Sequence, residues 1–167
     1  QAYKLFGSRP FDRYDFLFSL SGQMSGIGLE HHRSSENGLD VDYFTGWDGG
    51  SAINRDLLAH EFAHSWNGKY RRPAGVTAPN FNVPLSDSLL WVYEGQTQYW
   101  GYVLTARSGL RPLERARDEL SNVAAGVGGW ATDGDPQRAL RFNILRLHDE
   151  RRTGDPRFTA ALAAAGY

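Results

Sequence analysis

The pattern of apolar and polar positions changes near residue 50. Before it, short runs of β-branched, aromatic and aliphatic residues are separated by Gly, Ser, Asn and Asp. Three of these runs predict β-strands, at residues 14–20, 26–33 and 39–44. The glycine-rich stretch 46–50 predicts a loop. The first part of the chain is therefore expected to form a small sheet.

After residue 50, apolar residues recur at helical spacing. The first predicted helix has Ser51 as its N-cap and ends near residues 67–68. Residues 69–85 contain three prolines and no clear period, so we expect a long loop there.

The remaining helices are predicted from caps and prolines. A second helix begins at Ser86 or Asp87 and runs to about Ser108, with Gly109 at its C-cap. The other predicted helices are one that begins at Pro112, one over about 136–152 and a short alanine-rich one after Pro156.

A small sheet followed by helices is typical of an α+β fold. The chain has 167 residues, which suits one domain with a real core. We expect a single catalytic domain over 1–167, β-rich over 1–50 and helical over 51–167. Because the chain begins at Gln1 rather than Met, we also expect it to be part of a longer protein with other domains.

Composition and charge limit the partners and the metal ligands that this chain can be expected to have. The net charge of -1 gives no reason to expect a nucleic-acid or anionic-membrane partner. No apolar run is long enough for a transmembrane segment, so we expect a soluble protein, whether periplasmic, secreted or cytoplasmic. There is no cysteine, so a transition metal would have to bind to His, Asp or Glu.

Residues 60–64, His-Glu-Phe-Ala-His, carry the strongest chemical signal. Histidines at i and i+4 of a helix project from one face, and both imidazoles can reach one ion at about 2.0–2.1 Å. Glu61 lies beside His60, where it can reach a water molecule on that ion and act as a general base. The alternative is two ordinary histidines. Ile53 and Leu57 point the pair toward the core, however, where unpartnered imidazoles would be costly.

A catalytic zinc takes three protein ligands and keeps one position open. Glu94 is the candidate third ligand, because it lies on a stripe with Leu90, Gln98 and Gly101 that should face inward. A carboxylate that faces the core needs a cation. Gln98 either hydrogen-bonds a ligand histidine or is a plain polar core residue. The pattern thus predicts one catalytic Zn²⁺ at His60, His64 and Glu94.

The stretch 26–34 is the other unusual segment. If it is a strand, then Gly28, Glu30 and His32 share one face, and the glycine lets another backbone approach closely. His31 and His32 are potential additional ligands. A surface or hydrogen-bonded structural role is the default expectation for both.

Several segments in a fixed order resemble one known family, the glycyl aminopeptidases. These are gluzincins related to aminopeptidase N and thermolysin, and they often carry a PDZ domain. The matching segments are Gly-Leu-Glu-His at 28–31 with Ser34 and Ser35, His-Glu-Phe-Ala-His-Ser-Trp-Asn at 60–67, Arg-Arg-Pro at 71–73, 90–101 and 107–110. They span about residues 3–112, and the region after them matches weakly.

The resemblance implies a thermolysin-like zincin catalytic domain and a peptide substrate. It implies zinc at His60, His64 and Glu94, with Glu61 as base. It also implies that Glu30 binds the free α-amino group of a substrate with a small N-terminal residue such as Gly or Ala. Relatives use a tyrosine or histidine to stabilise the oxyanion, and none can be matched here, since Tyr99 lies about 140° round the helix from Glu94.

Two alternatives to an aminopeptidase stay open. One is a zinc endopeptidase with the same metal site and the same base. The other is a metal-bound but inactive peptide-binding module, against which the intact Glu61 argues, because a binding domain needs no base.

Overall fold

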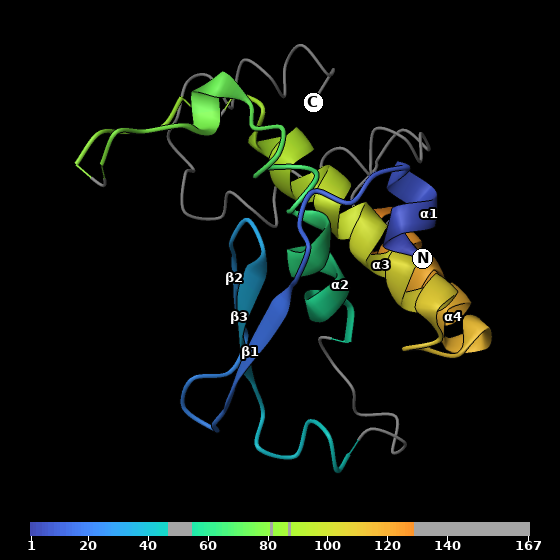
Figure 1. The fold of residues 1–167 in the computed structure, drawn as a ribbon. Helices are drawn as coiled ribbons and strands as arrows, with labels where there is room; N and C mark the ends of the chain where they lie inside the picture. The colour runs from blue at the N-terminus through green and yellow to red at the C-terminus, as the bar shows by residue number, and fades with distance from the viewer. Residues whose placement is uncertain (47–54, 81, 87, 129–167) are drawn as a thin grey trace. The chain divides into compact units, whose positions relative to one another are not determined.

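The computed structural model describes residues 1–46, 55–80, 82–86 and 88–128 (Figure 1). Residues 1–116 form one compact unit, and residues 117–167 form a second, of which only the last part of one helix is described. The predicted cap at Ser51, most of the predicted loop at 46–50 and the predicted helices at 136–152 and after Pro156 lie outside the described residues. The described part combines a small sheet with helices, which confirms the α+β class.

The sheet has three strands in the order β1-β3-β2. The strands are β1 (Asp15–Leu20), β2 (Ile27–Glu30) and β3 (Ser34–Leu39). β1 is parallel to β3, and β2 is antiparallel to β3, to which residues 31–33 connect it in a hairpin. The predicted strands at 14–20 and 26–33 are confirmed, although β2 ends at Glu30.

The third predicted strand, at 39–44, is wrong. The strand lies one segment earlier, and residues 41–46 form turns. The sequence of β3, Ser-Ser-Glu-Asn-Gly-Leu, has low intrinsic strand preference. Pairing with β1 on one side and β2 on the other overrides it, and the buried Asn37 side chain donates to the Leu17 carbonyl at 3.0 Å.

The helices broadly follow the predicted pattern. They are α1 (Ala2–Phe6), α2 (Arg55–Ala63), the π-helix η2 (Trp91–Gln96), α3 (Thr97–Ser108) and α4 (Leu113–Gly128), with a 3-10 turn, η1 (Ala74–Val76), in the predicted loop. Gly109 ends α3 in the left-handed region at φ 78°, as predicted for a C-cap. Three boundaries differ: α2 ends at Ala63, the second helix begins near residue 90, and α4 begins one residue after Pro112.

The core of the first unit lies around α2, which packs against α3 and against β2 and β3 (Figure 1). Its buried members are Ala2, Phe11, Ala59, Ala63, Trp66 and Leu104. Aromatic rings enclose this cluster; for example, Phe6 stacks on Trp66 with ring centroids 4.9 Å apart. The five-residue helix α1, which the sequence did not predict, is held here by that packing rather than by its own length.

The close approach of α3 to α2 depends on Gly101. A Cβ atom at this position would lie 3.2 Å from Cβ of His60 and 3.4 Å from the Asp56 carbonyl oxygen. Because α2 and α3 are so close, the middle of α2 is buried and the residues that precede α3 can reach it.

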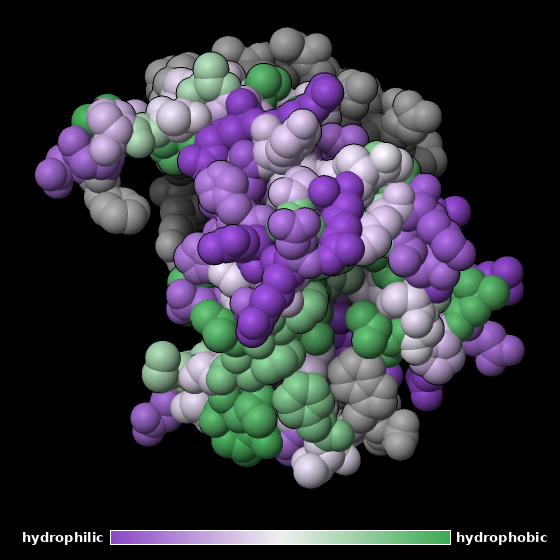
Figure 2. Space-filling view, in the orientation of Figure 1, coloured by the Kyte–Doolittle hydropathy of each residue, from purple (hydrophilic) through white to green (hydrophobic). Residues whose placement is uncertain are grey.

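The sheet also presents apolar side chains at the surface. Phe16, Leu17, Phe18 and Leu20 of β1 are each at least 39% exposed, and Figure 2 shows hydrophobic surface gathered over this part of the molecule. None of the described helices is both long and apolar enough to cross a membrane.

Candidate metal centre

Two buried histidines, His60 in α2 and His64 directly after it, face one another. His60 and His64 lie one turn apart, and their Nε2 atoms are 3.0 Å apart. Nδ1 of His64 is 3.0 Å from the Asn67 carbonyl oxygen, which can only accept a hydrogen bond. Nδ1 therefore carries the proton in the neutral ring, and the lone pair on Nε2 of His64 points toward His60.

Glu94 brings a carboxylate to the same point from η2. Its Oε2 lies 3.3 Å from Nε2 of His60 and 3.3 Å from Nε2 of His64. Burial would raise the pKa of the Glu94 carboxyl, but the adjacent imidazoles of His60 and His64 hold that pKa well below its usual range. The structure thus brings together the three side chains that the sequence predicted as ligands.

The π-helix is the local structure that places Glu94 there. Its wider turn leaves carbonyl groups outside the α-helical hydrogen-bond pattern, and side chains satisfy them. Asn67 Nδ2 donates to the Val92 carbonyl at 2.8 Å, and Thr97 Oγ1 donates to the Tyr93 carbonyl at 2.6 Å. Since the carbonyl of Asn67 also accepts from His64, Asn67 connects the two segments that carry the metal-binding side chains.

The three groups fit a divalent metal ion. Ligand atoms at about 2.0–2.1 Å from a tetrahedral zinc lie about 3.3 Å from one another. The observed separations of 3.0, 3.3 and 3.3 Å are close to that spacing. An ion at the centre would accept the lone pairs of both imidazoles and neutralise a largely buried carboxylate. His60, His64 and Glu94 could therefore hold one such ion.

Glu61 lies beside this centre. It is 3% exposed, and its Oε1 is 4.0 Å from Nε2 of His60. Burial raises the pKa of Glu61 to about 7. The carboxylate occupies space that is free because Gly28 of β2 has no side chain. A Cβ atom at Gly28 would lie 2.0 Å from Oε1 of Glu61.

Glu30 is two residues after Gly28 on β2 and faces the same way. A carboxylate oxygen of Glu30, one of Glu61 and a ring nitrogen of His64 lie within 4.8 Å of one another. The Tyr93 hydroxyl donates to Oε1 of Glu30 at 2.5 Å. Burial alone would raise the pKa of Glu30, but the hydrogen bond from Tyr93, together with nearby positive charge, holds it below its usual value.

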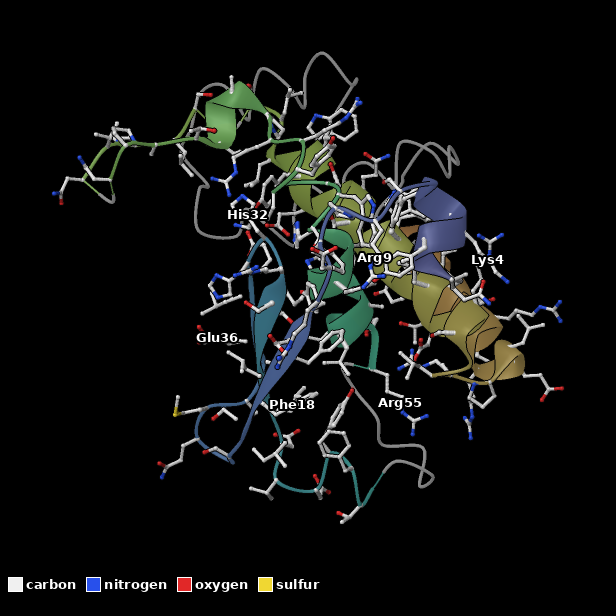
Figure 3. The ribbon with its side chains drawn as sticks, viewed as in Figure 1. Lys4, Arg9, Phe18, His32, Glu36 and Arg55 are labelled. Atoms are coloured by element: carbon white, nitrogen blue, oxygen red, sulfur yellow. The ribbon has the colours of Figure 1, made fainter. Side chains whose placement is uncertain are left out.

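The histidines next to Glu30 are exposed, and neither belongs to a group of potential metal ligands in the described part of the chain. His32 is in the turn of the β2–β3 hairpin rather than on a strand, so it does not share a face with Glu30 (Figure 3). His31 is exposed, and its Nε2 is 3.3 Å from Oε1 of Glu36. The Gln98 side chain hydrogen-bonds Asp56 instead of a ligand histidine, since its Nε2 donates to Oδ2 of Asp56 at 2.6 Å.

The sequence reasoning missed three neighbours of the centre: Asn67, Lys69 and Tyr93. Lys69 Nζ lies 3.1 Å from Oε1 of Glu30, and the Tyr93 ring lies 4.8 Å from the His64 ring. The only signal in the sequence is proximity, because Tyr93 precedes Glu94 and the other two residues closely follow His64. Tyr93 and Glu94 are consecutive residues of the π-helix, and both reach the site.

Comparison with known protein families identifies a match to the M61 glycyl aminopeptidases. The model of the M61 glycyl aminopeptidases matches residues 54–140, more than half of the chain. The matched region contains α2, η2 and α3, and with them His60, Glu61, His64 and Glu94, but not Glu30. No curated protein matches the chain.

Proposed function

Because the chain belongs to the M61 glycyl aminopeptidase family, a peptidase family, we propose that it is a zinc-dependent aminopeptidase that removes small N-terminal residues such as Gly or Ala. The observation that carries the proposal is the convergence of His60, His64 and Glu94 on one point, with the Glu61 carboxylate beside it. A small sheet packed against the helix that carries His60 and is followed directly by His64 also supports a thermolysin-like zincin fold.

In this proposal, His60, His64 and Glu94 hold one zinc ion. The ion, when bound, would supply a Lewis acid that lowers the pKa of a bound water molecule. Glu61 accepts the proton of the attacking water and later passes it to the leaving amine. Its place beside His60, with Oε1 4.0 Å from Nε2 of that ring, suits that role.

Glu30 gives the proposed aminopeptidase its preference for a free N-terminus. A carboxylate beside the base can pair with the α-ammonium of a peptide and so place the first peptide bond at the reacting centre. β2 is an edge of the described sheet, and its open side can hold the peptide backbone by strand addition. The preference for Gly or Ala is carried over from the family.

Hydrolysis of glycyl- and alanyl-anilides tests the proposal. We expect zinc-dependent activity in the wild-type protein and a loss of at least about 100-fold in Glu61→Gln, which keeps the size of the side chain and removes the base. Zinc binding without hydrolysis would instead support the inactive peptide-binding module. Full activity in Glu61→Gln would refute the assigned base.

The endopeptidase alternative shares the metal centre and the base, and it differs at Glu30. For an aminopeptidase, Glu30→Ala should remove the preference for free over N-acetylated substrates. For an endopeptidase, the same change should leave the ratio of the two rates unaltered. Glu36→Ala is the matched control, because Glu36 is an exposed glutamate on the adjacent strand (Figure 3).

A further inference from the structure

Glu30 is already ion-paired without any substrate. Lys69 Nζ lies 3.1 Å from its Oε1, the oxygen that also accepts the Tyr93 hydroxyl. The pair is mostly shielded from solvent, since the side chain of Lys69 is 13% exposed and that of Glu30 is 21% exposed. The carboxylate proposed to receive a substrate ammonium therefore carries an ammonium of the protein itself.

The segment after α2 is built to present this lysine. The Lys69 amide donates to the His64 carbonyl at 2.9 Å, which fixes the backbone directly behind a metal-binding residue. Gly68 precedes it at φ 133°, a conformation that favours glycine. A Cβ atom at Gly68 would lie 2.8 Å from the Tyr93 ring and 3.1 Å from Nδ1 of His64. A glycine at position 68 therefore lets the backbone lie close to Tyr93 and His64, and this places Lys69 next to Glu30.

We propose that Lys69 is an internal counter-ion that occupies Glu30 in the free protein and that the α-ammonium of a ligand must displace. The inference rests on the proposed role of Glu30 as the acceptor of that ammonium. Two ammonium groups on one carboxylate repel each other. The Tyr93 hydroxyl is neutral and can stay in place, while Lys69, on its flexible and strongly hydrated stem, can return to water.

The displacement makes Lys69 a specificity-determining residue. A ligand with a free α-amino group can form an ion pair with Glu30 only if the Lys69–Glu30 ion pair breaks. Its binding free energy is therefore less favourable by the free energy of the Lys69–Glu30 pair. A ligand whose amino group is acetylated is uncharged there and does not compete with Lys69 for Glu30. The affinity of such a ligand should therefore not depend on Lys69. Removal of the lysine charge should therefore strengthen binding of the first ligand alone.

Calorimetric titration with glycinamide and N-acetylglycinamide tests this in the zinc-loaded Glu61→Gln protein, which prevents turnover. Adding Lys69→Met should tighten glycinamide binding by at least about fivefold, the contribution of a modest ion pair, and leave N-acetylglycinamide unchanged. Lys69→Gln removes the same charge with a more polar side chain and should give the same result. Lys4→Met is the matched control, because Lys4 is the other lysine of the chain and is exposed on α1 (Figure 3).

Weaker or equal glycinamide binding in both Lys69 variants would overturn the inference and indicate a lysine that holds Glu30 in place. An equal gain for N-acetylglycinamide would overturn it too. Anilide hydrolysis by the wild-type protein separates this result from the proposed function. Activity without the selective gain refutes the counter-ion alone, and a selective gain without activity keeps the amine site and refutes the peptidase.

Discussion

A methyl group at Gly28 should disable the base without unfolding the protein. In Gly28→Ala, the new Cβ would lie 2.0 Å from Oε1 of Glu61, 2.6 Å from its Cδ and 2.8 Å from Cδ1 of Leu57. All three atoms are at the ends of flexible side chains. The collision can therefore be relieved by turning the Glu61 carboxylate away, rather than by moving β2 from α2.

The two expected magnitudes differ widely. Relief of the overlap should cost about 1–3 kcal/mol of unfolding free energy at most. Loss of a positioned general base should lower kcat about 100- to 10,000-fold. Zinc content should stay the same, because the three atoms nearest to the added carbon belong to Glu61 and Leu57 and not to the metal-binding side chains.

Anilide hydrolysis, zinc analysis and denaturant unfolding measure these effects together. Gly22→Ala is the control, because a Cβ atom there meets nothing within 4 Å. The double variant Gly28→Ala/Glu61→Gln should be no slower than Glu61→Gln alone, since both changes remove the same group. A Gly28→Ala protein that keeps zinc and wild-type kcat would refute the assignment of Glu61 at its present position.

Three further predictions concern the scaffold and the ion. Asn67→Ala should weaken zinc binding about 10- to 100-fold in a chelator competition assay, because it removes the hydrogen bond from the segment after α2 to the Val92 carbonyl of η2. The control Asn82→Ala, in an exposed loop, should leave zinc binding unchanged. Gly101→Leu should lower the unfolding free energy by about 1–3 kcal/mol in urea titration, because the first added carbon already lies 3.2 Å from Cβ of His60. Zinc at about 100 times its Kd should stabilise the folded protein by about 2.7 kcal/mol in thermal unfolding, and a chelator should reverse the gain.

The parts of the site that follow a regular period could be predicted from the sequence. His60 and His64 are one helical turn apart, so their convergence follows from α-helix geometry alone. Glu94 could be predicted from its place on an inward stripe, although the helix around it is a π-helix. The family resemblance is confirmed by the match to residues 54–140.

The rest depends on tertiary contacts that no local pattern encodes. β3 is a strand because it lies between two others, while the apolar residues after it, including Val41 and Phe44, form an exposed turn. The ion pair of Glu30 with Lys69 joins residues from β2 and from the segment after α2. Neither partner has a sequence period that points to the other, so only the folded chain reveals the pair.

We propose that the side chains of His60, His64 and Glu94 hold one zinc ion. Elemental analysis of purified wild-type protein beside Glu94→Ala tests it most directly, with circular dichroism to confirm that both are folded. We expect about one zinc per wild-type chain and a large loss in the variant, because two imidazoles alone lack the third ligand of a catalytic site. A folded Glu94→Ala protein that retains the full zinc content and affinity would contradict the account.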